Sequence, residues 1–425
     1  MLHDYILQAE KDCEPIFKNI EMMVETNQHR VLEAFKRAEI GDFHFNSTDG
    51  YGYDDSGRDG LETIYADVFG GEDALVRPQI VSGTHAIATT LYALLRPGDE
   101  LVYITGSPYD TLEEVIGKRG ESAGSLKDYE IAYNEVDLLP DGKIDYDGIK
   151  RTISDRTKVV GIQRSKGYED RPSFTIAEIE RMVKCVKSVN ENVIVFVDNC
   201  YGEFVEEKEP LHVGADIIAG SLIKNPGGGL VRAGGYIVGK KDLIERAANR
   251  LTAPGLGKEA GATLHTLQEM YQGFFLAPHV VGEALKGAVF TARLLELIGI
   301  ETSPKYDEKR TDIIQSIKFY DEENMIEFCQ LIQANSPINS YVAPYPSDMP
   351  GYDEKVIMAA GTFIQGSSIE LSIDGPIKHP YIAFMQGGLT YAHVKIAVTN
   401  SLKRMIETNR IRIPKQIDEK ILKQK

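Results

Sequence analysis

The stretch that decides the fold is NVIVFVDNCYGEFVEE (residues 192–207), followed by ADIIAGSLIKNPGGGLVRAGGYIVG (215–239). One unbroken apolar run ends in Asp198, and a second ends in Lys224, just before a group of glycines. Short β-branched runs without alternation are typical of strands buried on both faces, as in a parallel sheet. Open α/β sheets bind ligands at the carboxyl edge of their strands. We therefore expect Asp198 and Lys224 to lie at one edge and to share a site.

Lys224 follows Ser221 by three positions and precedes an Asn-Pro-Gly-Gly-Gly run. This setting predicts a Schiff-base lysine, whose amine needs a pKa lowered by a desolvated, cationic pocket. Asp198 is then the carboxylate that faces a pyridine nitrogen and keeps it protonated, so that the ring can accept electrons. The plainer alternatives are a surface lysine in a turn and an aspartate that caps the turn after a strand.

Length and composition limit the number of domains and the kinds of partner to expect. The chain has 425 residues, of which 42% are hydrophobic, and a net charge of −17. At roughly 100–200 residues per domain, this length predicts two or three domains. We assign an N-terminal helical arm and loop (1–60), a large cofactor-binding domain (61–280) and a C-terminal α+β domain (281–425). The acidic charge disfavours nucleic acid as a partner.

The cysteines and the apolar runs indicate the compartment. Cys13, Cys185, Cys200 and Cys329 form no CxxC pair and have no histidine at ligand spacing, which favours a reducing compartment over disulfides or zinc. No apolar run reaches about 18 residues, and the acidic N-terminus does not resemble a signal peptide. We expect a soluble cytoplasmic protein with neither a membrane partner nor a metal site.

Strands and helices alternate through the central region, which predicts an α/β domain. The segment PQIV (78–81) is expected to be a strand, and the following turn and helix begin at Ser82. Further helices are expected at 3–38, 61–69, 176–189, 241–251, 279–297, 322–334 and 389–406, and further strands at 101–104, 158–165, 236–239 and 367–373.

Small residues at the start of the helix after Ser82 leave free N–H groups at the positive end of its dipole, where a phosphate can bind. This makes Gly83 and Thr84 candidate phosphate ligands, although many strand–helix turns look alike. Tyr109 lies just past a strand end, where its ring could lie flat on a planar cofactor or simply pack in the core. Tyr53 and Arg58, in a loop rich in Gly, Asp and Tyr, form either a clamp on a phosphate or part of a solvated connector.

These features occur in one order along the chain, and together they resemble the fold-type I pyridoxal-phosphate (PLP) enzymes, more narrowly the carbon–sulfur lyases of cysteine and methionine metabolism. The closest resemblance is to the bacterial family labelled aluminium-resistance protein, also described as methionine γ-lyase-like or cystathionine β-lyase-like. The stretches that carry it are GYGYDDSGRDGLE (50–62), SGTHAI (82–87), VDNCYGEF (197–204), SLIKNPGGG (221–229), IQGSSIELS (364–372) and QGGLTY (386–391).

The resemblance implies an α/β fold with a large mixed or parallel-sheet domain and a smaller α+β C-terminal domain. It implies that PLP is the cofactor and that a sulfur amino acid loses a thiol to give a 2-oxo acid and ammonia. It also implies a homodimer or homotetramer with shared active sites. The resemblance implies that Lys224 forms the Schiff base and shuttles protons, that Asp198 contacts the ring nitrogen, and that Tyr109 is a catalytic residue stacked on the ring. Gly83, Thr84 and Ser221 are implied to hold the phosphate. Tyr53 and Arg58 are implied to reach the phosphate of the neighbouring subunit.

Two departures from the family pattern concern the substrate. The asparagine that usually contacts the ring hydroxyl is replaced by Arg164 and Ser165, after Gln163. The C-terminal strand YIAFMQGGLTY (381–391) lacks the arginine that normally binds the substrate carboxylate. The substitutes that the chain offers are Lys378, Arg232 and Arg164.

Three other functions share part of this pattern. An aminotransferase would keep Lys224 and Asp198, and Tyr201, three residues after the acid, is common there. A cofactor-binding protein without lyase turnover would fit the missing arginine. A nicotinamide-binding domain is disfavoured, because GGGLVRAGG lacks the GxGxxG spacing.

Overall fold

A seven-stranded sheet forms the larger lobe of the molecule. The computed structural model describes residues 2–121, 123–349, 352 and 354–414. The strand order is β1-β7-β6-β5-β4-β2-β3, with β7 antiparallel to both of its neighbours and the other pairs parallel. The predicted α/β class with a large mixed sheet is therefore confirmed. The strands are β1 (Asp73–Arg77), β2 (Glu100–Tyr103), β3 (Ala132–Glu135), β4 (Thr157–Gln163), β5 (Ile194–Asp198), β6 (Ile217–Ser221) and β7 (Gly235–Gly239).

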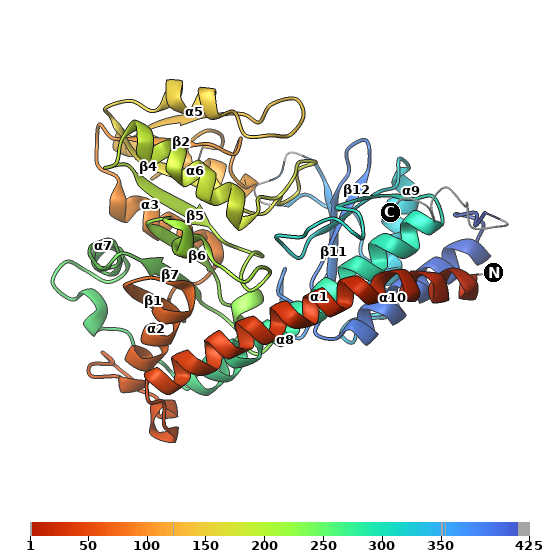
Figure 1. Cartoon of the computed structure of the whole chain (residues 1–425), viewed down its shortest axis with the longest axis horizontal. Helices are drawn as coiled ribbons and strands as arrows, with labels where there is room; N and C mark the ends of the chain where they lie inside the picture. Colours follow the sequence, from red (N-terminus) through yellow and green to blue (C-terminus); the bar gives the residue numbers. More distant parts are fainter. Residues whose placement is uncertain (1, 122, 350–351, 353, 415–425) are drawn as a thin grey trace.

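Helices cover both faces of this sheet (Figure 1). Phe196 packs in the apolar cluster on one face, and Val195 and Val197 pack in the cluster on the other. This explains why β5 shows no polar alternation: each fully buried side chain contributes about 1.5–3 kcal/mol. The helices of this lobe are α2 (Ser56–Phe69), α3 (Gly83–Leu94), α4 (Asp110–Ile116), α5 (Tyr146–Thr152), α6 (Ile176–Val189) and α7 (Lys241–Leu251).

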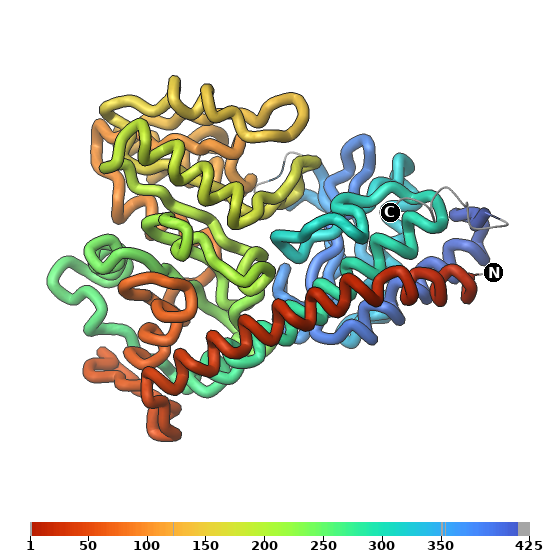
Figure 2. The backbone as a smooth tube through the Cα atoms, viewed as in Figure 1, coloured from red at the N-terminus to blue at the C-terminus, as the bar shows by residue number. Residues whose placement is uncertain are grey.

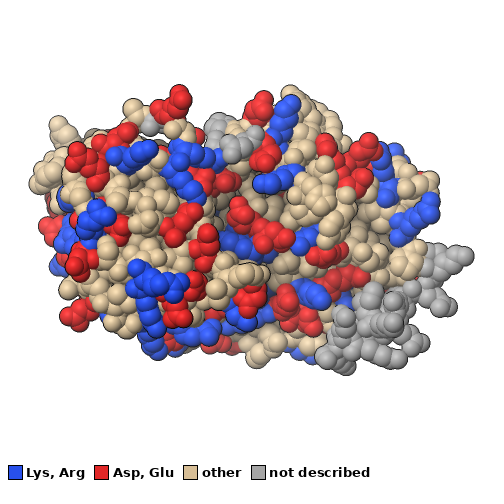
Figure 3. Space-filling model, turned by 90° about the horizontal axis from the view of Figure 1, so that it is seen from above, with Lys and Arg blue, Asp and Glu red and all other residues tan. Residues whose placement is uncertain are grey.

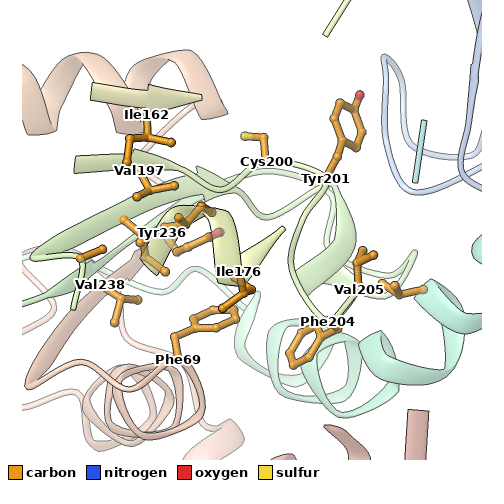
Figure 4. Packing of buried hydrophobic residues seen from close by; sticks show 14 of the residues in the cluster. Phe69, Ile162, Ile176, Val197, Cys200, Tyr201, Phe204, Val205, Tyr236 and Val238 are labelled. Carbon is orange, nitrogen blue, oxygen red and sulfur yellow. The ribbon is translucent and has the colours of Figure 1, made fainter. Parts of the chain in front are cut away.

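Figure 4 shows part of the larger of these clusters, where Phe69 packs against both Phe204 and Tyr236. Cys200 and Tyr201 lie in the turn that follows β5, above this packing. The core beneath the turn therefore fixes the backbone from which these two side chains project.

The smaller lobe is an antiparallel sheet with helices on one side. Its strand order is β10-β11-β12-β9-β8. This agrees with the predicted α+β C-terminal part. Its elements are β8 (Glu301–Ser303), β9 (Gln315–Lys318), α9 (Glu322–Ala334), β10 (Val356–Ala359), β11 (Ser372–Pro376), β12 (Ile382–Gln386) and α10 (Tyr391–Glu407).

Two long helices join the lobes. Figure 2 shows α1 (Leu2–Arg37) running beside α8 (Leu267–Leu297) from one lobe to the other. The helices are antiparallel: Arg293 bonds Asp12, Lys286 bonds Glu21, and the Gln28 amide bonds the carbonyl of residue 275. This pair holds the lobes in a defined relation.

Three expected boundaries are wrong. The strand predicted at 78–81 is β1, which ends at Arg77, so 78–81 belong to the turn before α3. The connecting helix begins at Leu267 rather than at 279, because Pro278 lies inside α8 without ending it. The strand expected from 367 begins only at Ser372. The predicted division at residue 60 falls inside α2 and that at 280 inside α8, and the three-part division stays a prediction.

Candidate active site

The carboxyl ends of three neighbouring strands bring the candidate residues together. Gln163 at the end of β4 is the register partner of Asp198 at the end of β5, and Asp198 pairs with Ala219 in β6. Lys224 follows β6 by three residues. The expected shared edge is therefore present.

A cavity of about 280 Å³ opens at this edge, between the two lobes. Six of the eight predicted site residues line it: Gly83, Thr84, Tyr109, Asp198, Ser221 and Lys224. The smaller lobe contributes Ile314, Ser367 and Gln386. The site thus draws on residues as far apart in the chain as Gly83 and Gln386.

The amine of Lys224 lies against an aromatic ring. Its Nζ is 3.9 Å from the centre of the Tyr201 ring. Burial by itself lowers the pKa of Lys224, but the acidic groups around it, Cys200 and Tyr201 first among them, outweigh burial and raise that pKa above its ordinary value. The expectation of a cationic pocket with a lowered pKa is therefore wrong: the amine is desolvated, but its neighbours are acidic or neutral.

Asp198 is enclosed at the base of the cavity. Burial raises the pKa of this carboxyl, and the nearby Lys224 amine and the backbone N–H of Cys200 oppose that effect. This N–H donates to Asp198 Oδ1 at 3.1 Å. The acid and the lysine therefore face one cavity and interact electrostatically, as a ring held between them would require.

Tyr109 immediately precedes α4 and lines the cavity. Burial raises its pKa, and Lys224 opposes this. Its hydroxyl shares a hydrogen bond with the hydroxyl of Tyr352, and its ring lies 6.0 Å from that of Tyr168. Tyr109 is therefore held in place by two further tyrosines that sequence reasoning missed.

The start of α3 forms a narrow cradle. A Cβ added at Gly83 would lie 3.2 Å from Ser221 Cβ and 3.3 Å from Cys200 Sγ, which is tighter than ordinary contact. The Ser82 side chain caps the helix by accepting from the His85 N–H. The backbone N–H groups of the first turn thus remain close to Ser221, in an arrangement that suits a phosphate.

Tyr53 and Arg58 do not line the cavity of their own chain. Tyr53 is half exposed and stacks on Tyr51, with ring centres 5.4 Å apart. Arg58 is buried and donates to the carbonyls of Gly52 and Gly261. A role for either residue at a phosphate therefore requires a second chain, and it stays a prediction.

None of the three cations offered as carboxylate ligands lines the cavity. Arg164 is fully buried behind β5, where Asn199, Glu209 and Glu206 hold its guanidinium. Arg232 pairs with Glu269, and Lys378 lies 3.6 Å from Glu354 at the surface. Ser165 and Gln163, in contrast, do line it.

The smaller lobe adds a polar group that sequence reasoning missed. Asp374 in β11 is fully buried, and its Oδ2 accepts from Tyr168, Gln386 and Ser367. Burial raises its pKa to about 6, against those three donors. The only sequence signal was a lone acid in an otherwise apolar strand, two residues from a serine.

Other classes of site are not indicated by the described residues. Among them, no group of three or more His, Cys, Asp or Glu side chains could hold a metal ion. In the part of the chain that the structure describes, no helix combines the length and the apolarity needed to cross a bilayer. Figure 3 shows charges of both signs interspersed over one face.

Comparison with solved structures identifies the fold. A protein of Listeria innocua, proposed to be a cystathionine beta-lyase involved in aluminum resistance, is 59% identical and superposes with a TM-score of 0.93 over 95% of this chain and 99% of its own. The PLP-dependent protein YhfS of Escherichia coli shares the fold at 17% identity, with a TM-score of 0.62 over 92% and 97% of the two chains. The fold is that of the fold-type I PLP-dependent enzymes.

The sequence comparisons give the family. The methionine gamma-lyase family model matches residues 2–406, and the chain belongs to that family. The uncharacterized protein YnbB of Bacillus subtilis is 63% identical over 408 residues, covering 96% of this chain and 97% of its own. The L-methionine gamma-lyase of Pseudomonas putida is 28% identical over 207 residues, covering 48% of this chain and 45% of its own. The family resemblance inferred from the motifs is therefore confirmed.

Proposed function

We propose that this protein is a PLP-dependent carbon–sulfur lyase that acts on a sulfur amino acid and, with the uptake of one water molecule, releases a thiol, a 2-oxo acid and ammonia. The observation that carries the proposal is that Lys224, Asp198 and Tyr109 line one cavity, in which the Lys224 amine acts electrostatically on the Asp198 carboxyl. Relatives named as methionine gamma-lyase and as cystathionine beta-lyase support the reaction class.

The residues present fit the cofactor. Lys224 would attach it covalently, Asp198 would stay ionised against its ring nitrogen, and the Gly83–Ser221 cradle would hold its phosphate. When bound, PLP supplies the electron sink that makes the α-proton of an amino acid removable.

The chain's own groups would then move the protons. The Lys224 amine, once released from the cofactor, would take the α-proton and hold it within the cavity. Tyr109, fixed by Tyr352 and Tyr168, would lie on the ring and shield the site from water. The sulfur that departs from the β or γ carbon would take up a proton and leave as a thiol.

We also propose that the active unit is a cytoplasmic homodimer or homotetramer. Large apolar side chains gather exposed on the loop that contains Tyr53 and on the segment beside it, namely Phe43, Phe45, Tyr51, Tyr53, Leu256 and Leu264. The N–H of Gly261 donates to the Tyr51 carbonyl, so these two segments form one surface. A second copy covering that surface would bring Tyr53 and Arg58 toward a neighbouring cavity.

The decisive experiment is replacement of the lysine. Purified protein should show the visible absorption of bound PLP, and Lys224→Ala should abolish it together with thiol release. Lys184→Ala, which removes an exposed amine on α6, should change neither. Retention of both signals in Lys224→Ala would contradict the proposal.

The same assay separates the alternatives. Cystathionine, cysteine, homocysteine and methionine should each be tested for thiol and 2-oxo acid release. An aminotransferase would release no thiol and would convert an added 2-oxo acid to an amino acid. A cofactor-binding protein without turnover would show the absorption but no change with any amino acid.

A further inference from the structure

The orientation of the Gln386 side chain is fixed by its partners. Gln386 ends β12, is 2% exposed, and lines the cavity. Its Nε2 donates to Asp374 Oδ2 at 3.1 Å and to Ser372 Oγ at 3.2 Å. An ionised carboxylate only accepts hydrogen bonds, so the NH₂ end must face Asp374. The amide oxygen, Oε1, is the polar atom left for the cavity.

Asp374 is itself held firmly. Its Oδ2 takes the Tyr168 hydroxyl at 2.6 Å and the Ser367 hydroxyl at 3.4 Å in addition to the Gln386 amide. Its other oxygen, Oδ1, is buried and has no partner among the described residues. Tyr168, Ser367 and Gln386 all line the cavity. The smaller lobe therefore presents a wall centred on a negative charge.

This wall offers no positive charge to a substrate carboxylate. Among the described residues that line the cavity, Lys224 alone carries a cationic side chain, and the proposed function commits it to the cofactor. A carboxylate placed against the smaller lobe would meet the Gln386 oxygen and, behind it, Asp374. That contact is repulsive in a low-dielectric site, whereas an N–H donor there gains a hydrogen bond.

We propose that Gln386, oriented by Asp374, determines substrate specificity by accepting a hydrogen bond from an N–H donor of the substrate. The inference rests on the proposed function and deepens it. The donor could come from two sources: an ammonium group at the far end of the sulfur substituent, or a carboxamide in place of the free carboxylate, in which case the product is a 2-oxo amide rather than a 2-oxo acid.

Two pairs of ligands distinguish these sources, with the dissociation constant measured by calorimetry. The first pair is L-methionine and L-methioninamide. The second is S-propyl-L-cysteine and S-(2-aminoethyl)-L-cysteine, which differ by a methyl group against an ammonium group. We expect the donor-bearing member of at least one pair to bind about 5- to 50-fold more tightly, as one hydrogen bond to a buried acceptor implies. The pair that shows the preference identifies the source.

Variants tie that preference to the residue. Gln386→Leu should remove the preference, and Gln386→Met, which keeps the length of the side chain without the amide oxygen, should remove it as well. Asp374→Asn should weaken it while leaving the absorption of bound cofactor, because a neutral amide no longer fixes the direction of Gln386. Gln28→Leu, in α1 and remote from the cavity, is the matched control and should change nothing.

Three results would overturn the inference: equal affinity within both pairs, tighter binding of both members without the donor, or a preference unchanged in Gln386→Leu. Absence of measurable binding by either donor ligand would overturn it as well. If Gln386→Leu does not fold, the wild type and Gln386→Met still decide the question. Cofactor absorption and thiol release, measured separately, report on the proposed function, so the two proposals can fail independently.

Discussion

The Nζ atom of Lys224 lies 3.9 Å from the centre of the Tyr201 ring, and the Tyr201 hydroxyl donates to the carbonyl of Ser367 at 3.3 Å. The ring therefore connects the reactive amine of the larger lobe to the smaller lobe. The Tyr201 backbone has φ of +68°, a left-handed conformation that costs free energy for a residue other than glycine. The packing beneath the turn maintains this conformation, and with it the position of the ring.

Replacement of that ring should loosen the amine. Tyr201→Leu removes the cation–π contact, which contributes about 0.5–2 kcal/mol, so PLP should bind roughly 2- to 30-fold more weakly. Tyr201→Phe keeps the ring and should stay within about threefold of the wild type. Absorbance titration with PLP measures both constants. Equal loss in the two variants would assign the effect to the hydroxyl instead.

Replacement of the strand-end acid should separate binding from turnover. Asp198→Ala removes the carboxylate that would face the ring nitrogen, so the cofactor should still bind weakly while kcat falls by about 10²-fold or more. Single-substrate kinetics at saturating PLP measures kcat. Asp216→Ala, at the opposite end of the neighbouring strand, is a control for general destabilisation. Full turnover in Asp198→Ala would show that the acid has no part in the chemistry.

The cradle at the start of α3 should hold the phosphate. Ser221→Ala removes one hydroxyl donor to a charged group, which is worth about 1.5–3 kcal/mol, so PLP affinity should fall by roughly 10- to 100-fold. Pyridoxal, which lacks the phosphate, should bind wild type and variant alike. A parallel loss for pyridoxal would place Ser221 elsewhere on the cofactor.

The cross-subunit clamp can be tested by mixing chains. Arg58→Ala should lower PLP affinity, but it also removes hydrogen bonds to Gly52 and Gly261 within its own chain. Arg58→Ala and Lys224→Ala chains should therefore be unfolded and refolded together, and assayed at a PLP concentration too low to load Arg58→Ala alone. If Arg58 acts on the neighbouring site, hybrid dimers contain one intact site, and part of the activity returns. No recovery would mean that Arg58 acts only within its own chain.

A buried acid below the site should make stability depend on pH. Burial raises the pKa of Glu203 to about 8, although the Tyr236 hydroxyl donates to it at 2.6 Å. The folded chain thus binds a proton that the unfolded chain releases near pH 4.3, and stability falls as the pH rises from there toward 8.

Glu203→Gln keeps the hydrogen bond without the charge. Between pH 5 and pH 8, the free energy of unfolding of the wild type should fall by about 2–4 kcal/mol because of Glu203, whereas that of the variant should not show this fall. Urea denaturation at pH 5, 6.5 and 8 measures the difference. Glu14→Gln, at an exposed pair on α1, should follow the wild type. Parallel curves for Glu203→Gln and the wild type would show that the Glu203 carboxyl ionises at the same pH in the folded chain as in the unfolded chain.

The sequence predicted the site where local pattern and sheet geometry agree. Strand ends in a parallel sheet meet at one edge, so the positions of Asp198 and Lys224 followed from two apolar runs. The helix start at Gly83 followed from its small residues and its cap. The beginning of α8 did not follow, because Pro278 suggested a boundary that tertiary packing overrides.

Contacts between distant segments were beyond sequence reasoning. Tyr168, Asp374 and Gln386 come together only when the smaller lobe docks on the larger, and no spacing along the chain encodes that meeting. The raised pKa of Lys224 was missed for the same reason, because it depends on which acidic side chains the fold brings near the amine. The sequence offered Arg164 as a ligand for the substrate carboxylate, but its guanidinium forms a buried ion pair with Glu209.

The antiparallel pair of α1 and α8 also determines how a ligand can enter. The 31-residue α8 passes from one lobe to the other without a break, and the 36-residue α1 braces it along its length. Both lobes share this helix pair, so we expect no hinge-like opening between them. Because one continuous helix spans both lobes, we expect the lobes to keep their relative positions when a ligand enters the cavity between Lys224 and Gln386, so that side chains and short loops make the adjustment.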